Sequence, residues 1–412
     1  MVSRALRLID AGSLDAEGVD DLAMRLGIGD RHLRRLFVEH LGTTPLAVAM
    51  TRRVHFAKRL LEETHLPISQ VAVSAGFNNA RRFNEAFRKC FDRTPREIRR
   101  ATREARLPAS ATDGGAVNLR LSYRPPLAWA AALSYLGPRA IPGVEHVSGE
   151  IYRRTIALDG VEGILSVFPD STGDGLVLQT PVSTAPRFFE VVERARTLFD
   201  LTADPVVIEE QLNHDPDLAR FDVPAGLRVL GAWDRFELAI RAILGQQVTV
   251  KGATRLAGRL VRTLGRPMRD PAAADGPAWI FPTPERVARA TVEKIASIGI
   301  PSARAAAIRG LAFAVADGAP VLESATDLDE AVARLVALDG IGAWTAQYIA
   351  MRALREPDAF PSGDLGLRRA LSEDGKPLTA KALEVRSEAW RPWRAYAAVR
   401  LWMAPSPILE KR

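Results

Sequence analysis

The sequence of 412 residues predicts a multidomain, mainly α-helical protein that contains one α+β domain. Three observations support this: a helix-turn-helix pattern that occurs twice near the N-terminus, short β-like runs in the middle of the chain, and helical patterns from Leu230 onward. We therefore expect an all-α domain over 1–106, a linker over 107–116, an α+β domain over 117–228 and an all-α domain over 229–412.

The positive charge of the chain is concentrated in its first quarter. The formal net charge is +7. Residues 1–106 contain 20 Lys and Arg against 13 Asp and Glu, whereas 107–412 contain 36 of each. A basic module of this kind is expected to attract phosphate groups. The alternative is that its basic helices simply present a solvated face.

The N-terminal segment repeats one pattern after about fifty residues. Leu33, Phe37, Leu41, Thr44 and Pro45 recur as Phe83, Phe87, Phe91, Thr94 and Pro95. Gly27 and Gly76 each stand at a predicted turn between two helices, so each copy is expected to form one helix-turn-helix. Cys90, beside Phe91, is predicted to be a small buried core residue.

The second helix of each copy is expected to expose side chains that can contact DNA. Arginine and asparagine can read guanine and adenine edges in the major groove. The candidate base or backbone contacts are Arg31, His32, Arg34, Arg35, Asn78, Asn79, Arg81 and Arg82.

The middle of the chain mixes helical and strand patterns. A helix is predicted over 127–136, strands over 144–157, 163–168 and 176–179, and a further helix over 186–199. This order predicts an α+β arrangement.

The stretch from Leu338 to Asp364 carries the most specific signal. Thr326 and Asp329 form a capping-box pattern before a helix that ends at a Gly340-Ile-Gly342 turn. Two glycines leave the turn without Cβ atoms, so amides here and at the start of the next helix, with Thr345, could contact a DNA phosphate.

An aromatic pair and one carboxylate follow this turn. Trp344 and Tyr348 stand one helical turn apart, and Asp364 precedes another helical run. A carboxylate can stabilise a developing positive charge and deprotonate water, while aromatic faces attract electron-poor or cationic groups. The alternatives are that Asp364 only caps its helix and that the aromatic residues belong to the core.

These motifs, taken together, resemble the helix-hairpin-helix DNA glycosylases of the AlkA type over about 117–405. The resemblance rests on five ordered motifs. They are 241–247, 281–285, 340–346, 360–364 and 390–397 running on to Trp402. Residues 10–100, with Gly76-Phe77 and Thr94-Pro95, resemble the AraC-type regulator domain.

The resemblance implies a monofunctional DNA-3-methyladenine glycosylase II type N-glycosyl hydrolase that excises alkylated purines. Asp364 is implied as catalytic, and Trp344, Tyr348, Trp402 and Tyr135 as the base cleft. Gln247 stands where relatives insert a side chain into the gap left by the flipped base. Glycosylases with lyase activity carry a lysine at the position of Trp344, so a lyase-type enzyme is disfavoured. Asp339 stands where the family usually has proline.

The expected partners are duplex DNA with alkylated bases and, through residues 1–106, promoter DNA. One cysteine is too few for a four-cysteine zinc site or iron–sulfur cluster, so neither is expected; a monovalent cation at the hairpin turn is compatible with the motif. No apolar run is long enough to span a membrane. We expect a cytoplasmic, nucleoid-associated monomer.

Two questions stay open at this level. The rival function is a transcription regulator of the alkylation response with a weak or inactive glycosylase domain. Fused relatives also carry a methyl-accepting zinc domain with four cysteines, so either the start of this chain lies upstream or its DNA reader works without that sensor.

Overall fold

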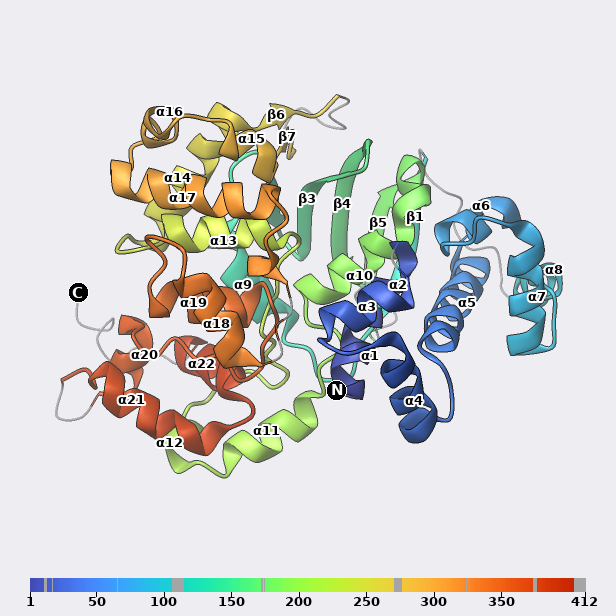
Figure 1. Ribbon diagram of the computed structural model, residues 1–412, viewed down its shortest axis with the longest axis horizontal. Helices are drawn as coiled ribbons and strands as arrows, with labels where there is room; N and C mark the ends of the chain where they lie inside the picture. Colours follow the sequence, from blue (N-terminus) through green and yellow to red (C-terminus); the bar gives the residue numbers. More distant parts are fainter. Residues whose placement is uncertain are drawn as a thin grey trace. The chain divides into compact units, whose positions relative to one another are not determined.

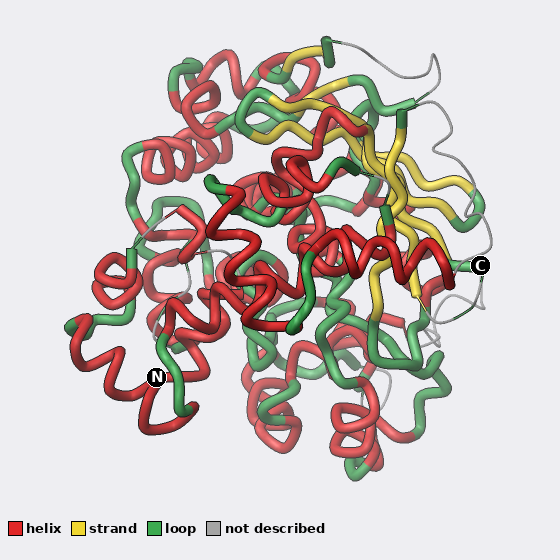
Figure 2. Tube along the Cα trace, turned by 90° about the vertical axis from the view of Figure 1, so that its right-hand side faces the viewer, coloured by secondary structure: helices red, strands yellow, loops and turns green. Residues whose placement is uncertain are grey.

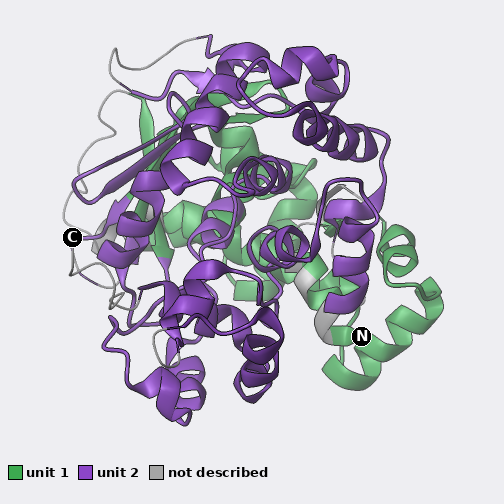
Figure 3. Cartoon of the chain, turned by 90° about the vertical axis from the view of Figure 1, so that its left-hand side faces the viewer, with its two compact units in different colours: residues 1–121, 156–167, 177–193 green, residues 122–155, 168–176, 194–412 purple. Residues whose placement is uncertain are grey.

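The computed structural model describes residues 1–10, 13–16, 18–64, 66–105, 115–171, 173, 175–269, 276–323, 325, 327–372 and 376–403. Helices predominate among them (Figure 2). The chain divides into two compact units (Figure 3). The first comprises 1–121, 156–167 and 177–193, and the second comprises 122–155, 168–176 and 194–412. Most of the linker predicted over 107–116 lies outside the described residues.

The first unit begins with eight helices (Figure 1). They are α1 (Val2–Asp10), α2 (Ser13–Ala16), α3 (Val19–Arg25), α4 (Asp30–Leu41), α5 (Pro45–Glu63), α6 (Ile68–Ser74), α7 (Ala80–Phe91) and α8 (Pro95–Ala105). Gly27 between α3 and α4 and Gly76 between α6 and α7 have φ of 71° and 78°, which favours glycine. Both predicted helix-turn-helix pairs are therefore present.

Cys90 is exposed, so the prediction of a buried core cysteine was wrong. The inner face of α7 contains Phe83, Phe87 and Phe91. The rings of Phe83 and Phe87 have centroids 5.6 Å apart, and those of Phe87 and Phe91 have centroids 4.9 Å apart. Because these phenylalanines are four residues apart, Cys90 lies beside the packed face rather than on it.

The helix-turn-helix segment packs against residues of the sheet region that belong to the same unit. Ser74 Oγ donates to the carbonyl of Ala185 at 2.6 Å, and both groups are buried. Phe189 contacts the ring of Phe56 edge-on, with ring centroids 4.9 Å apart, and the Arg52 guanidinium lies 4.0 Å from the centroid of Phe189. The first compact unit therefore extends beyond the helix-turn-helix pairs.

The five-stranded sheet has the order β1-β5-β4-β3-β2. Its strands are β1 (Ala116–Ser122), β2 (Glu145–Ser148), β3 (Ile151–Leu158), β4 (Val161–Pro169) and β5 (Gly175–Pro181). Four helices accompany the sheet: α9 (Trp129–Leu136), η1 (Gly137–Arg139), η2 (Val182–Arg187) and α10 (Phe188–Leu198). The α+β prediction is confirmed, but the sequence reading missed β1 and merged β2 with β3.

The rest of the second unit is helical apart from the β6–β7 pair. Its elements are α11 (Pro205–Asn213), α12 (Pro216–Ala219), α13 (Arg235–Leu244), α14 (Val250–Leu264), β6 (Arg266–Pro267), β7 (Trp279–Ile280), α15 (Pro284–Ala288), α16 (Val292–Ala296), α17 (Ser302–Ala316), η3 (Pro320–Leu322), α18 (Leu328–Val336), α19 (Ala343–Arg352), α20 (Leu365–Ala370), α21 (Ala380–Ser387), η4 (Glu388–Trp390) and α22 (Arg394–Met403). Helix α13 is nearly all buried and packs against both α17 and α19, so it forms the centre of this core.

Helix α18 is capped one residue later than the sequence pattern indicates. The Asp327 carboxylate accepts from the amide of Glu330 at 2.9 Å, while Thr326 lies outside the described residues. Both side chains are good caps, so the pattern alone does not decide between them.

A buried cluster of charges joins the sheet to α13 within the second unit. Arg154 on β3 is the cross-strand partner of Glu145 on β2 and bonds Glu237 on α13 at 2.7 Å. Arg241 bonds Glu145 at 2.9 Å and lies 3.4 Å from Glu237. Burial raises the pKa of Glu237, whereas the pKa of Glu145 is lowered because the attraction of Arg241 and Arg154 outweighs its burial.

The variant Arg154→Met should be strongly destabilised, because it leaves two buried carboxylates with one guanidinium. Breaking a buried pair from one side typically costs about 3–5 kcal/mol. The control is Arg153→Met on the same strand, since the Arg153 side chain is only half-buried. Thermal unfolding of both variants provides the measurement. Equal melting temperatures for the two would contradict a stabilising role for the cluster.

Candidate functional site

Asp364 is held where three helices meet. It is the N-cap of α20, and its Oδ1 accepts from the amide of Leu367 at 3.0 Å. The same oxygen accepts from the indole N–H of Trp402 on α22 at 3.0 Å, and Oδ2 accepts from the indole N–H of Trp344 on α19 at 3.2 Å. The Asp364 side chain therefore both caps α20 and contacts two aromatic residues of the predicted base cleft.

A glycine makes room for this arrangement. A Cβ atom at Gly366 would lie 3.0 Å from Asp364 Oδ1 and 3.5 Å from the Trp402 ring. Any larger residue would therefore press against the carboxylate and the indole that bonds it.

The predicted aromatic residues form a continuous wall beside the carboxylate. Trp344 stacks on Tyr348 with centroids 5.4 Å apart and planes inclined by 12°. The ring of Trp402 lies 6.2 Å from Tyr348 at 59°. All three side chains are half-buried, so they combine core packing with exposed ring surface. Because Trp344 and Tyr348 already stack directly, a base would have to lie against their free faces.

The structure adds two arginines that sequence reasoning missed. Arg352, buried on α19, donates from Nη1 to the phenol oxygens of Tyr135 at 2.6 Å and Tyr348 at 2.8 Å. Its other nitrogens donate to the carbonyls of Leu230 and Gly231. The Arg139 guanidinium lies 3.8 Å from the centroid of Tyr135. Arg352 could have been suspected from its spacing, four residues after Tyr348 and eight after Trp344.

These cations act differently on the two phenols. Burial raises the pKa of Tyr135 to about 12 despite the attraction of Arg352. Burial also acts on Tyr348, but Arg352 and Arg139 outweigh it, so the pKa of Tyr348 falls below its usual value. The two phenol oxygens lie 3.1 Å apart.

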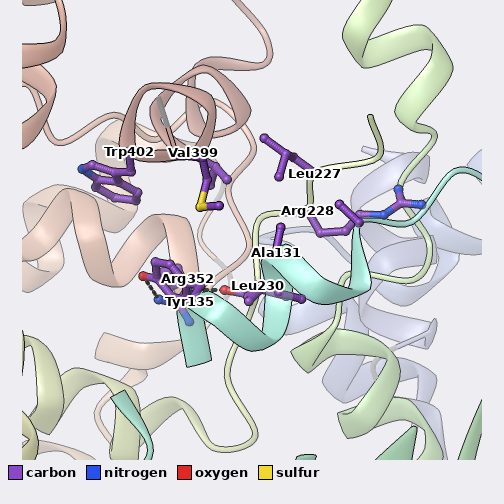
Figure 4. Close-up of a pocket in the computed structure, with 11 residues that line it drawn as sticks. Ala131, Tyr135, Leu227, Arg228, Leu230, Arg352, Val399 and Trp402 are labelled. Carbon is purple, nitrogen blue, oxygen red and sulfur yellow. Dashed lines mark hydrogen bonds between the residues drawn. The ribbon is translucent and has the colours of Figure 1, made fainter. Parts of the chain in front are cut away.

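Tyr135, Arg352 and Trp402 line one small cavity (Figure 4). Figure 4 shows them facing Leu227, Leu230 and Val399. The cavity has a volume of about 20 Å³, which is room for about one water molecule. It is too small for a purine, so it acts as packing space behind the aromatic wall.

The hairpin between α18 and α19 has one glycine that nothing else could replace. Gly340 has φ of 81°, and a Cβ there would lie 2.6 Å from the Cβ of Ala307. The amides of Gly340 and Gly342 donate to no backbone carbonyl among the described residues. Thr345 is buried, and its Oγ1 accepts from Gln246 Nε2 at 3.0 Å. The same amide group donates to the carbonyl of Gly340 at 2.9 Å, so Gln246 braces the turn.

Gln247 lies in the exposed turn between α13 and α14. Its φ of 56° is unusual for a residue with a side chain, and it is followed by the exposed Val248. This placement leaves the side chain free to project from the surface.

The candidate DNA contacts of the N-terminal unit are all exposed. Several have local partners as well: Asn79 Oδ1 caps α7, Arg81 pairs with Glu85 at 2.9 Å, and Arg34 pairs with Asp30 at 3.5 Å. Arg35 lies 2.9 Å from His32 Nδ1.

Comparisons with known proteins agree with this architecture. A helix-turn-helix domain model matches residues 22–101, the AlkA N-terminal domain model matches 118–234, and the model of HhH-GPD superfamily base excision DNA repair proteins matches 240–395. The 3-methyladenine DNA-glycosylase of Archaeoglobus fulgidus has the same fold over 69% of this chain and 97% of its own (TM-score 0.60, 23% identity). The fold and the hairpin define a helix-hairpin-helix base-excision glycosylase.

Two curated relatives narrow this class. The chain is 41% identical over 403 residues to a probable bifunctional transcriptional activator/DNA repair enzyme AlkA of Mycobacterium tuberculosis, covering 98% of this chain and 80% of the relative. It is 32% identical to DNA-3-methyladenine glycosylase 2 of Escherichia coli, covering 68% of this chain and 95% of that protein. The chain belongs to the AlkA family of DNA-3-methyladenine glycosylases, in a form with an N-terminal helix-turn-helix domain.

Two kinds of feature are absent from the described part of the chain. No helix there has the length and apolar character to cross a membrane. No three His, Cys, Asp or Glu side chains there are grouped to bind a metal ion.

The pKa of Tyr348 can be tested directly. The chain has five tyrosines, and burial raises the pKa of Tyr135, Tyr152 and Tyr396, whereas that of Tyr348 is lowered. Tyr348→Phe should therefore remove a tyrosinate absorbance step that occurs below the ordinary phenol pKa. The control variant Tyr396→Phe should keep this step. Its persistence in Tyr348→Phe would show that the arginines do not act on this phenol.

Proposed function

We propose that this glycosylase excises alkylated purines such as 3-methyladenine and 7-methylguanine from duplex DNA by hydrolysis. The observation that carries the proposal is the meeting of Asp364 with the indoles of Trp344 and Trp402. It combines the charge that the reaction needs with the ring surfaces that an electron-poor base prefers.

The proposed reaction breaks the bond between C1′ and the base nitrogen. Alkylation makes the base cationic, so the bonding electron pair moves to the base, which leaves as a neutral molecule. The sugar becomes oxocarbenium-like, and the Asp364 carboxylate stabilises this positive charge. Water then attacks C1′ and gives its proton to Asp364, which leaves an abasic site. No cofactor is needed in this scheme.

Trp344 supports hydrolysis rather than lyase chemistry. A lyase mechanism needs an amine at this point of the hairpin to form a Schiff base with the sugar. The indole has no such nucleophile, and its N–H is engaged by Asp364. The enzyme should therefore be monofunctional.

The roles of the neighbouring residues follow from their positions. The base leaves the stack and rests on the free faces of Trp344 and Trp402, with Tyr348 and Tyr135 behind them. Gln247 fills the gap in the duplex and can hydrogen-bond the unpaired base. The amides of Gly340 and Gly342 bind a phosphate, and Thr345 supports that turn from inside rather than contacting DNA itself.

Asp364→Asn separates the catalytic role from the capping role. Asparagine caps a helix about as well as aspartate, and its oxygen can still accept from Leu367 and Trp402, so the melting temperature should stay near that of the wild type. Loss of the charge should slow single-turnover base release by roughly two or more orders of magnitude.

The matched control is Asp327→Asn, which alters the cap of α18 in the same way and lies away from the aromatic wall. It should keep both stability and base release. If Asp364→Asn retains most of its single-turnover activity, or loses activity only as far as it loses stability, the catalytic assignment is wrong.

We further propose that the helix-turn-helix unit reads promoter DNA. Helices α4 and α7 expose basic side chains at their N-terminal ends, where such helices contact base edges. Arg82 is exposed and has no ion pair among the described residues, so its guanidinium is available for a contact with DNA.

Arg82→Ala should relax sequence preference at one or two base pairs, each by about 1–3 kcal/mol. Selection of bound sequences from a randomised duplex pool, followed by affinity measurements, tests this. Arg88→Ala, near the other end of α7, is the control and should leave the preference unchanged. Uniform weakening on every sequence would instead place Arg82 on phosphates.

A further inference from the structure

Helix α14 carries an unusual run of like charges. Lys251, Arg255, Arg259 and Arg262 follow one another at intervals of four, four and three residues, and the helix contains no acidic residue. Like charges at this spacing destabilise a helix. None of the four forms an ion pair with another described residue, so no acidic partner within the described part of the chain balances this run of charge.

A hollow of about 390 Å³ lies along this face. Three of these cations, Arg255, Arg259 and Arg262, line it together with the hydroxyl-bearing residues Thr263 and Ser297, and no carboxylate contributes to its lining. It contains none of the residues of the Asp364 site.

Two of the arginines are held in place by neutral partners. Arg259 Nη1 donates to the carbonyl of Ile298 at 3.0 Å, and a Cβ at the adjacent Gly299, whose φ is 99°, would lie 2.9 Å from that nitrogen. The Arg262 guanidinium lies 4.4 Å from the centroid of Trp279. A carbonyl and an indole orient these cations without neutralising them, which is the arrangement expected of an anion-binding surface.

The position of α14 indicates which anion is bound. The helix begins directly after the Gln247 turn, and Thr249 caps it by accepting from the amide of Gly252 at 3.1 Å. With a rise of about 1.5 Å per residue, Arg255 and Arg262 lie roughly 12 and 22 Å along the chain from Gln247. A duplex advances about 3.4 Å per base pair, so these distances correspond to roughly four to six base pairs.

We propose that the basic face of α14 is a second DNA-binding surface, which contacts backbone phosphates about four to six base pairs from the damaged base. This rests on the proposed function, because Gln247 is taken to mark the lesion. This surface extends the contact with DNA beyond the hairpin. It is a local basic surface within residues 107–412, whose net charge is zero by composition. It therefore contributes affinity without reading sequence.

The test compares two doubly substituted full-length proteins. Arg255→Gln with Arg262→Gln removes two charges from the hollow, and Arg220→Gln with Lys381→Gln removes two exposed charges elsewhere in the same unit. Binding to an undamaged duplex is measured over a range of salt concentrations. The first protein should show a log–log salt slope shallower by about two, and the control should show the slope of the wild type.

A second arm locates the contact on DNA. A duplex with an uncleavable abasic analogue is prepared with neutral methylphosphonates about four to six base pairs from the analogue. The wild type and the control should bind this modified duplex more weakly than the unmodified duplex. The Arg255/Arg262 variant should bind the two duplexes with equal affinity.

Equal salt slopes for the two variants would overturn the proposal. So would a variant that binds DNA normally but loses thermal stabilisation by inorganic phosphate or adenosine monophosphate, because the hollow would then hold a small phosphate compound. Neither arm uses base release. If the glycosylase proposal were wrong, the wild-type protein would release no free base, while the difference in salt slope between it and the Arg255/Arg262 variant would remain.

Discussion

The Asp364 carboxylate accepts hydrogen bonds from N–H groups on three helices, and the geometry of the whole site depends on these three hydrogen bonds. One amide comes from α20, and two indole N–H groups come from α19 and α22. Both carboxylate oxygens are oriented by neutral donors, so the charge is positioned without being paired to a cation. This suits a group that must meet a developing positive charge, because no salt bridge has to be broken first.

The other buried charges of the second unit serve a different purpose. Glu145, Arg154, Glu237 and Arg241 neutralise one another inside the protein and join the sheet to α13. Arg352 is bonded to carbonyls and phenols, and it fixes Tyr135 and Tyr348 behind the aromatic wall. Most of these structural charges are thus buried, whereas Asp364 is only half-buried.

Much of this site could be predicted from the chain, because its main parts are local in sequence. The Gly340-Ile-Gly342 turn, the spacing of Trp344 and Tyr348 and the cap at Asp364 are all found within one stretch. Arg352 and Gln246 were missed because they bond Tyr135 and Thr345, which lie 217 and 99 positions away in sequence. Arg139 was missed although it lies only four residues after Tyr135, because a lone arginine at that spacing does not by itself predict a ring contact. Strand β1 was missed because its partner β5 lies far away in sequence, and β6 and β7 were missed because two residues are too few to show a strand pattern. Cys90 was misplaced because the four-residue spacing of the phenylalanines moves the packed face of α7 away from it.

The most direct test of hydrolysis at Asp364 is the product of the reaction on alkylated duplex DNA. Purified protein should release free methylated purines, and the DNA should break only after treatment with alkali or heat. Borohydride should trap no covalent complex, because Trp344 offers no amine. Absence of free base, or a trapped protein–DNA adduct with strand breaks before alkali, would contradict this account.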